Sequence, residues 1–162
     1  MRCIPTADVI EGAKHPSEAA EVIGHQHAEN LFVDALNEGR LHHAWMITGP
    51  KGIGKATFAW RLAKYLLCSA IQEDGPSLFG DTPEFIQNLD IDPDHPILRR
   101  IQARSEGRLS VVRRPYDAKR KAFKAQITIE EIRKLKSFFA LSAADGGRRV
   151  VIIDAADDMN VN

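Results

Sequence analysis

The sequence predicts an α/β fold in which helices flank a mainly parallel sheet. Two short apolar runs, AWMIT at 44–48 and VVIID at 150–154, have the length and composition of buried strands. Segments with apolar residues at helical spacing surround both runs, and strands that alternate with helices are typical of parallel sheets. A glycine-rich loop, ITGPKGIGK at 47–55, directly follows the first run, so it joins a predicted strand to a predicted helix.

Length and composition indicate a soluble globular protein with one ordinary domain. The chain has 162 residues, 44% of them hydrophobic, which is enough for a real core. Its formal net charge is zero, so overall charge favours neither nucleic acid nor membrane as a partner. No apolar run approaches the roughly 18 residues of a membrane span. Cys3 and Cys68 are far apart and form neither a disulfide framework nor a metal quartet. We therefore expect a cytoplasmic protein.

The N-terminal part is expected to contain an arm, a helix and the first strand. Residues 1–20, which include two prolines and a glycine, predict an extended arm, and 21–162 then belong to the α/β domain. A helix is predicted over 25–37, because apolar residues recur there at helical spacing and Gly39 follows at the position of a C-terminal cap. The run 44–48 is the first buried strand.

A second helix is predicted over 55–68, immediately after the glycine loop. Phe58, Leu62 and Leu66 recur on one stripe of this helix, with alanines beside them. A stripe of this kind is typical of a helix that packs one face on a core.

The middle of the chain, 72–127, reads as a variable insertion with two opposite charges. Seven acidic residues and no lysine or arginine occur up to position 94, whereas 97–125 contain ten basic residues and two acidic ones. LSVVRR at 109–114 is a plausible strand. The basic part could touch nucleic-acid phosphates or form a solvated face turned toward the acidic part. Only Tyr116 and Phe123 offer aromatic stacking there, which favours the solvated face.

The last predicted elements are a helix and the second strand. Thr128 with Glu131 predicts a capping box ahead of an amphipathic helix. The turn ADGGRR and the strand 150–154 follow. The chain stops eight residues after Asp154 without a closing element, so we expect a piece of a longer protein, incomplete at its C-terminus.

The glycine loop is close to the Walker A pattern, G-x-x-x-x-G-K followed by Ser or Thr, which binds nucleotide phosphates. Gly49, Gly54 and Lys55 fit this pattern. Glycines let consecutive backbone N–H groups point into one concavity, and the lysine reaches the terminal phosphates. The hydroxyl that ligates Mg²⁺ is missing, because Ala56 stands there and Thr57 lies about 100° further round the helix. The alternative is a tight loop with a solvated lysine.

Asp154 ends the second strand, where nucleoside triphosphatases carry an aspartate that holds the metal. Ala155 stands where a catalytic glutamate is usual, and Asp157 and Asp158 could at most cap a following helix. The alternative is an ordinary aspartate at a strand end. Defects in both motifs predict a nucleotide-binding fold with no catalytic residue.

Two stretches resemble the AAA+ subunits of bacterial clamp loaders, which are P-loop NTPases. EVIGHQHAENLFVDALNEGRLHHAWMITGPKGIGKATFAWRLAKYLLC, at 21–68, is similar to their opening: an IGQ-like box, a helix, HA before the first strand, and Walker A. ITIEEIRKLKSFFALSAADGGRRVVIIDAADDMN, at 127–160, resembles the helix that leads to their Walker B strand. The two stretches cover about half of the chain. Within DNA polymerase III, the delta-prime branch is the most similar, and its members commonly carry degraded Walker motifs.

The resemblance implies a nucleotide site that is weak or vestigial. Val22, Ile23 and Gly24 would lie at the adenine pocket. The residues at the phosphates would be Gly49, Pro50, Lys51, Gly52, Ile53, Gly54, Lys55, Ala56 and Thr57, with Asp154 at the metal. ATP and Mg²⁺ are expected to bind weakly or not at all. No zinc is expected, because the family's four-cysteine module has only Cys68 here.

The resemblance also implies partners. The chain would be a non-catalytic component of DNA polymerase III, in a ring with delta and gamma/tau subunits, and would reach the sliding clamp and primed DNA through that assembly. The family's sensor strand, arginine finger and two C-terminal domains would follow Asn162. Because that strand normally lies between the two Walker strands, we expect exposed sheet edges here.

Two other functions stay open. An active gamma/tau-type ATPase would need Thr57 to serve the metal and a carboxylate such as Asp157 to replace the missing glutamate. A weaker alternative is a nucleic-acid-binding module built on the basic middle.

Some remaining residues have structural interpretations. Consecutive His42 and His43 would face opposite sides of a strand, so they are not a metal pair. Trp45 and Trp60 are expected in the core or at an interface. Cys68, at the end of an apolar helix, is expected to be a small buried hydrophobe.

Overall fold

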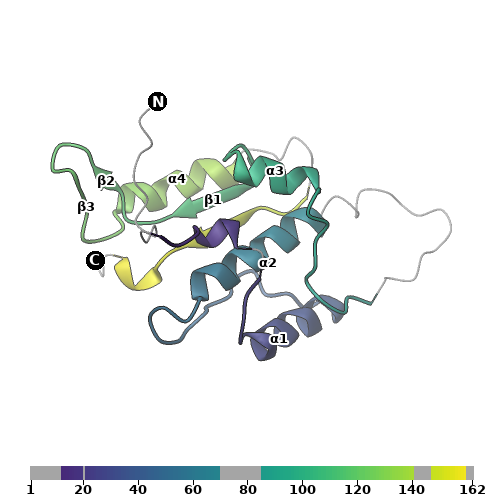
Figure 1. Ribbon diagram of the computed structural model, residues 1–162. Helices are drawn as coiled ribbons and strands as arrows, with labels where there is room; N and C mark the ends of the chain where they lie inside the picture. Colours follow the sequence, from purple (N-terminus) through teal and green to yellow (C-terminus); the bar gives the residue numbers. More distant parts are fainter. Residues whose placement is uncertain (1–11, 20, 70–84, 141–146, 160–162) are drawn as a thin grey trace.

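The computed structural model describes residues 12–19, 21–69, 85–140 and 147–159 (Figure 1). The elements in chain order are η1 (Pro16–Glu18), α1 (Gln26–Asn37), α2 (Lys55–Ser69), α3 (Pro96–Gln102), β1 (Leu109–Val112), β2 (Tyr116–Asp117), β3 (Ala122–Phe123), α4 (Ile129–Ala140), β4 (Val150–Ile153) and η2 (Ala156–Asp158). Both predicted N-terminal helices, the helix after Thr128 and the strand at 150–154 are confirmed. None of the helices in the described ranges is long and apolar enough to cross a membrane.

The fold is α/β with a small parallel sheet, as predicted. β1 and β4 pair in parallel, with Leu109 opposite Val150 and Val112 opposite Ile153. α4 lies between these strands in the sequence and contacts β1, whereas α2 contacts β4. Figure 1 shows α2 and α4 on opposite sides of the two strands. β2 and β3 form a separate antiparallel hairpin between β1 and α4.

The predicted first strand, 44–48, is wrong. The structure has no strand at these positions, and the run is not buried, since Trp45 is 40% and Met46 81% exposed. Among the described residues no strand pairs with this run. A strand forms only where a neighbour satisfies its backbone N–H and C=O groups, so apolar composition was not sufficient here. The Trp45 ring does contact Phe32, edge to face, with 5.0 Å between the ring centroids.

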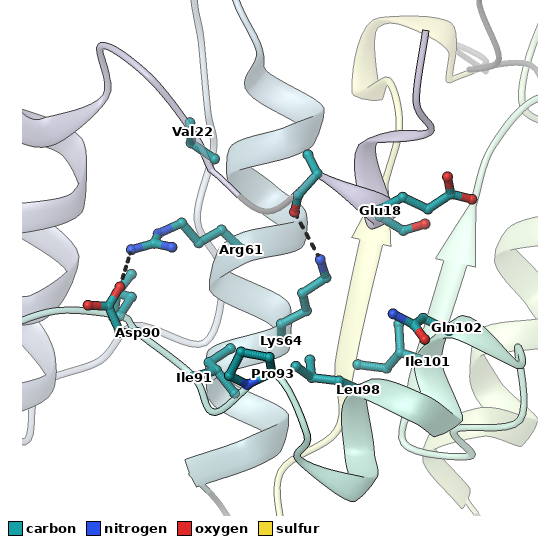
Figure 2. A pocket seen from close by; sticks show the side chains of 13 residues that line it. Glu18, Val22, Arg61, Lys64, Asp90, Ile91, Pro93, Leu98, Ile101 and Gln102 are labelled. Carbon is teal, nitrogen blue, oxygen red and sulfur yellow. Dashed lines mark hydrogen bonds and ion pairs between the residues drawn. The ribbon is translucent and has the colours of Figure 1, made fainter.

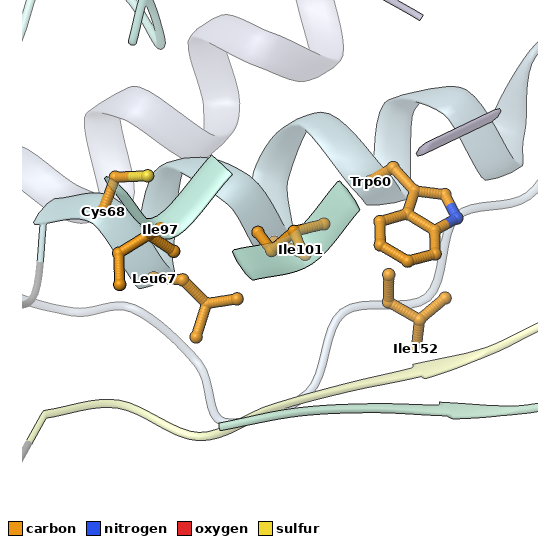
Figure 3. Close-up of a cluster of buried hydrophobic side chains, with 7 residues drawn as sticks. Trp60, Leu67, Cys68, Ile97, Ile101 and Ile152 are labelled. Carbon is orange, nitrogen blue, oxygen red and sulfur yellow. The ribbon is translucent and has the colours of Figure 1, made fainter. Parts of the chain in front are cut away.

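The main hydrophobic core lies between α2, α3 and one face of the β1–β4 sheet (Figure 3). Leu67 of α2 and Ile97 of α3 are fully buried. The other buried members of this cluster are Trp60, Ala63, Cys68, Ile101 and Ile152. The predicted core position of Trp60 and the predicted burial of Cys68 are therefore confirmed. Full burial of a side chain the size of leucine contributes about 1.5–3 kcal/mol.

A second apolar cluster joins α1 to α2. Phe32 and Val33 of α1 pack with Phe58 and Leu62 of α2 and with Leu89. α1 ends as predicted at Gly39, whose φ is 63° and whose N–H donates to the carbonyl of Leu36 at 3.0 Å. A glycine with positive φ at this position closes the last turn of a helix.

α3 and β1 lie within 72–127 and contribute to the main core. The ring of His95 accepts a hydrogen bond from the N–H of Ile97 at 3.2 Å, and Pro96 occupies the first helical position. These are start signals of a helix. Periodicity is hard to detect in a helix of 7 residues, which is why α3 was missed.

α4 begins with a cap that differs from the predicted capping box. The N–H of Glu131 donates to the backbone carbonyl of Thr128 at 3.0 Å, and a hydrogen bond from the Thr128 side chain to Glu130 lowers the pKa of Glu130. The Glu131 carboxylate instead accepts from Lys134 Nζ at 2.6 Å. The helix boundary was predicted correctly, but the capping partner was wrong.

Only part of the predicted N-terminal arm is described. Residues 12–19 contain the short helix η1, which packs against α2. Lys64 of α2 also donates from Nζ to the carbonyl of Ala19 at 3.3 Å. This segment therefore lies against the domain.

Candidate functional site

The glycine loop at 49–54 leads directly into α2. Gly54, the last residue before the helix, has a φ of 98°, and a Cβ there would lie 3.3 Å from Nε2 of His25. Both a positive φ and a close neighbour favour glycine. The loop thus adopts a backbone that depends on its glycines, at the N-terminus of a helix, where backbone N–H groups favour anions.

Lys55 closes the loop onto itself. Its Nζ donates to the carbonyl of Gly49 at 2.8 Å and to the carbonyl of Pro50 at 2.9 Å. An ammonium group has three N–H donors, so two of them are used by the loop's own backbone. A phosphate bound in the loop would have to compete with these carbonyls for the lysine.

His25 joins the loop to the start of α1 and was missed in the sequence. Its Nε2 donates to the carbonyl of Ile53 at 2.9 Å, so the proton of the neutral ring lies on that nitrogen. Its ring stacks on Phe58 with 5.4 Å between centroids and 22° between planes. The only sequence signal was its place directly after Gly24. His25 positions the glycine loop relative to α2.

The three residues predicted at the adenine pocket have different surroundings. Val22 is half-buried and packs on the cluster that joins α1 to α2. Ile23 is 88% exposed, and Gly24 has a φ of 82°. The hydrogen bond of His25 to Ile53 places this segment beside the glycine loop. The Ile23 side chain is exposed there and does not line a buried pocket for a base.

A cavity of about 340 Å³ lies beside α2, away from the glycine loop (Figure 2). Val22 is the one predicted nucleotide-binding residue among its lining residues. The others are Ser17, Glu18, Ala19, Arg61, Lys64, Leu89, Asp90, Ile91, Pro93, Leu98, Ile101 and Gln102. The cavity is therefore not a continuous pocket around the predicted phosphate loop.

Two cations of α2 line this cavity. Arg61 donates to Glu29 of α1 at 2.9 and 3.2 Å and to Asp90 at 3.2 Å. Burial acts to lower the pKa of Arg61, but the hydrogen bonds and charges of Glu29 and Asp90 outweigh it and raise the pKa. Burial lowers the pKa of Lys64. Arg61 therefore acts as a structural tie between α1, α2 and the segment before α3.

Asp154 lies where the sequence predicted, directly after β4. Its N–H donates to the carbonyl of Val112 at 2.9 Å, which extends the ladder between β1 and β4 by one bond. α2 packs on β4, and Figure 1 shows the N-terminal end of α2 and the C-terminal ends of both strands on the same side of the molecule. This edge is where parallel α/β folds place ligands.

The residues after Asp154 provide little for catalysis. Asp158 in η2 pairs with Arg114, with 3.1 Å between Oδ2 and Nε, and Asp157 is exposed. Within the described ranges, no three His, Cys, Asp or Glu side chains gather closely enough to hold a metal ion. The expectation that zinc is absent stays a prediction. Ala56 and Thr57 lie in the first turn of α2. Because Ala56 directly follows Lys55, that position offers no side-chain oxygen to a metal ion.

Comparison with known proteins gives a family match over most of the chain. A family model described as "DNA polymerase III, delta subunit" matches residues 24–162. No solved structure matches the chain.

Individual relatives are similar over one segment. DNA polymerase III subunit gamma of Buchnera aphidicola (Acyrthosiphon pisum) is 43% identical over 53 residues, 33% of this chain and 15% of that protein. DNA polymerase III subunit tau of Escherichia coli K12 is 40% identical over 53 residues, 33% of this chain and 8% of that protein. DNA polymerase III subunit gamma/tau of Mycobacterium tuberculosis H37Rv is 41% identical over 54 residues, which are 33% of this chain and 9% of that protein. The chain therefore covers only a small part of these relatives.

Proposed function

The chain belongs to the family described as DNA polymerase III, delta subunit, and we propose that it is a delta-prime-type subunit of the clamp loader. It would help to load the sliding clamp onto primed DNA during replication in the cytoplasm. Its ring partners would be delta and gamma/tau subunits, and it would reach the clamp and DNA through that assembly. The likeness to gamma and tau relatives over about 50 residues supports a related subunit of the same assembly.

A degenerate ATP site is the second part of the proposal. The observation that carries it is Ala56, which follows Lys55 at the start of α2 and offers no hydroxyl to Mg²⁺. Lys55 itself is engaged by the carbonyls of Gly49 and Pro50. Ala155 follows Asp154, so no carboxylate stands there to activate water. The loop has the glycines and the lysine of the Walker A pattern, whereas the side chains needed for catalysis are missing.

Nucleotide binding and turnover test this part. A fluorescent ATP analogue is titrated into the purified protein with and without Mg²⁺, and phosphate release is followed in the same samples. We expect weak binding that Mg²⁺ does not change, and no turnover. Ala56→Thr restores the missing hydroxyl and should make binding Mg²⁺-dependent, whereas Lys55→Ala is the control that removes what binding there is.

The alternative function is an active gamma/tau-type ATPase, and the identity to gamma and tau relatives is the observation that favours it. Micromolar binding with turnover in the unchanged protein would support this alternative and contradict a degenerate site. Thr57→Ala would then abolish the Mg²⁺ dependence, because this alternative needs the Thr57 hydroxyl at the metal.

The assembly itself needs a separate experiment. The protein is mixed with purified delta and gamma/tau subunits and the products are separated by size-exclusion chromatography with light scattering. We expect one complex that contains all three chains and that loads a labelled clamp onto primed DNA. Elution of this chain alone at micromolar concentration would contradict the proposed clamp-loader role.

A further inference from the structure

The hairpin formed by β2 and β3 is a small but well-defined unit. Tyr116 pairs with Phe123 across the two strands, and their rings meet edge to face with 5.3 Å between centroids. The Asp117 carboxylate accepts from the N–H groups of Lys119 and Arg120 at 2.9 and 3.2 Å. These bonds fix the turn, so the side chains at the tip leave from a defined backbone.

The tip of the hairpin is strongly basic. Four cations and one acid, Asp117, occur within 116–124. The cations, all exposed, are Lys119, Arg120, Lys121 and Lys124. Arg120 is 85% exposed and reaches Asp117 at only 4.0 Å, and in the part of the chain that the structure describes, the three lysines make no ion pair.

The acidic stretch does not neutralise this tip. Of its three described carboxylates, Asp90 and Asp94 pair with Arg61 and Arg99, at 3.2 and 3.3 Å, and Asp92 accepts from the N–H of Asp94 at 2.9 Å. Figure 1 shows the hairpin at the opposite end of the molecule from α3 and the segment before it. At the base of the hairpin, Arg114 is already paired with Asp158. The solvated-face interpretation therefore fits α3 but leaves the hairpin without its expected acidic counterpart among the described residues.

We propose that the β2–β3 hairpin binds nucleic-acid phosphates through Lys119, Arg120, Lys121 and Lys124. A polyanion of closely spaced phosphates can engage several exposed cations at once. The aromatic rings of the hairpin contact each other, so the contact is made to the backbone and does not depend on base sequence.

An acidic protein surface is the competing partner, and the hairpin suits it less well. Protein interfaces have an apolar centre surrounded by polar groups. Within 116–124 no large apolar side chain is exposed, since Tyr116 and Phe123 are both half-buried. Charge is thus the main feature that the tip offers. This inference goes beyond the proposed function, in which DNA is reached through the assembly, and it does not depend on it.

The test measures binding of the purified protein to fluorescent 20-nucleotide probes, one duplex and one single strand, between 50 and 200 mM salt. The logarithm of the binding constant should fall with the logarithm of the salt concentration, with a slope of about −0.9 per phosphate contact on duplex and about −0.7 on a single strand. With four contacts, duplex binding should weaken roughly 100-fold between 50 and 200 mM salt. The ratio of the two dissociation constants at the same salt concentration shows whether duplex or single strand is the preferred partner. Probes of the same length but of different base sequence should bind with equal affinity.

The decisive variant carries Lys119→Gln, Arg120→Gln, Lys121→Gln and Lys124→Gln. It should lose binding by about 100-fold at low salt and lose most of the salt dependence. A matched control removes the same net charge from exposed cations elsewhere, by changing Lys14, Arg40, Arg99 and Lys136 to Gln, and should bind within about twofold. A third variant with Lys119→Arg, Lys121→Arg and Lys124→Arg keeps the charge and should bind normally.

Several outcomes would overturn the inference. Equal losses in the Gln variant and its control would mean that general charge, not the hairpin, is responsible. The inference also fails if the unchanged protein does not bind either probe, if the folded Gln variant binds normally, or if the hairpin binds poly-L-glutamate but not DNA. The Gln variant should still assemble with delta and gamma/tau subunits, so failure of assembly and failure of hairpin binding are separate results.

Discussion

The two ends of α2 differ in what surrounds them. At the carboxyl end, Leu67 is fully buried, and its carbonyl accepts from Nη2 of Arg108 at 3.4 Å. At the amino end, Lys55 is half-buried and its side chain bonds only to its own loop, and Ile53 is 50% exposed. One helix thus connects a packed core to an open loop. Stability is concentrated at one end, which leaves the other free to bind a ligand or to lose that ability without loss of the fold.

The largest effect should come from the buried ion pair next to the carboxyl end of α2. Glu106 and Arg108 are both nearly fully buried, with 3.0 Å between Oε1 and Nε. Arg108→Met leaves Glu106 buried without this partner and should lower the free energy of unfolding by about 3–5 kcal/mol. Urea denaturation measures the change.

The control for this prediction removes both charges. Glu106→Leu with Arg108→Met replaces the pair by apolar groups of similar size and should recover most of the lost stability. If the single variant is as stable as the double variant, the pair does not anchor this end of the helix and the comparison between the two ends of α2 weakens.

A somewhat smaller loss is expected at Leu67. Leu67→Ala leaves a cavity in the main core and should cost about 2–5 kcal/mol. Leu31 of α1 is 52% exposed, so Leu31→Ala is a matched control and should change the free energy of unfolding by less than about 0.5 kcal/mol. Equal losses for both leucines would contradict the assigned core.

The glycine loop should respond more weakly than the core. Gly54→Ala forces a side chain into a backbone with positive φ and toward His25, and should cost about 1–3 kcal/mol. Gly107→Ala is the control, because a Cβ there meets no atom within 4 Å. Thermal unfolding of both variants compares them. Should Gly54→Ala prove as costly as Arg108→Met, the loop would be part of the stable unit and the contrast with the carboxyl end would be lost.

The smallest effect at neutral pH is expected at Cys68. Burial raises the pKa of the Cys68 thiol to about 11, above its ordinary value of 9.0. The folded state therefore holds the proton more tightly than the unfolded chain. The resulting stability is fully present below pH 9 and is lost as pH rises through about 11.

A difference measurement isolates this contribution. The protein and its Cys68→Ala variant, both with Cys3 changed to Ser, are unfolded at pH 8 and pH 10.5. The stability difference between them should shrink at the higher pH, and other titrating groups such as Lys64 cancel in the comparison. A difference independent of pH would mean that the thiol is not sequestered from solvent at this end of α2.

Much of the fold was visible in local patterns. The helices after His25 and after the glycine loop have strong apolar periodicity, and Gly39 marks a helix end. β4 was predicted correctly, whereas 44–48, of similar composition, is not a strand. The difference lies in the partner: β4 pairs with β1, and nothing in the described structure pairs with 44–48. α3 was missed because a helix of 7 residues is too short for its apolar periodicity to be recognised.

The candidate site was only partly predictable. The glycine spacing, Lys55 and the alanine after it could be read directly from the sequence. That Lys55 turns back to Gly49, and that His25 bonds to Ile53 28 positions away, could not be read there. Nor could the pairing of Asp158 with Arg114, which leaves that carboxylate engaged.

By itself, the sequence determined where the three longer helices α1, α2 and α4 form, which loop is rich in glycine, and which side-chain oxygens are missing from it. These properties depend on neighbours within a few positions, such as helical spacing and caps. Only the tertiary structure decided which apolar run becomes a strand, which cations are paired and which are exposed on the hairpin. Those outcomes depend on groups far apart in the chain, because a strand needs a partner and an ion pair needs both of its charges.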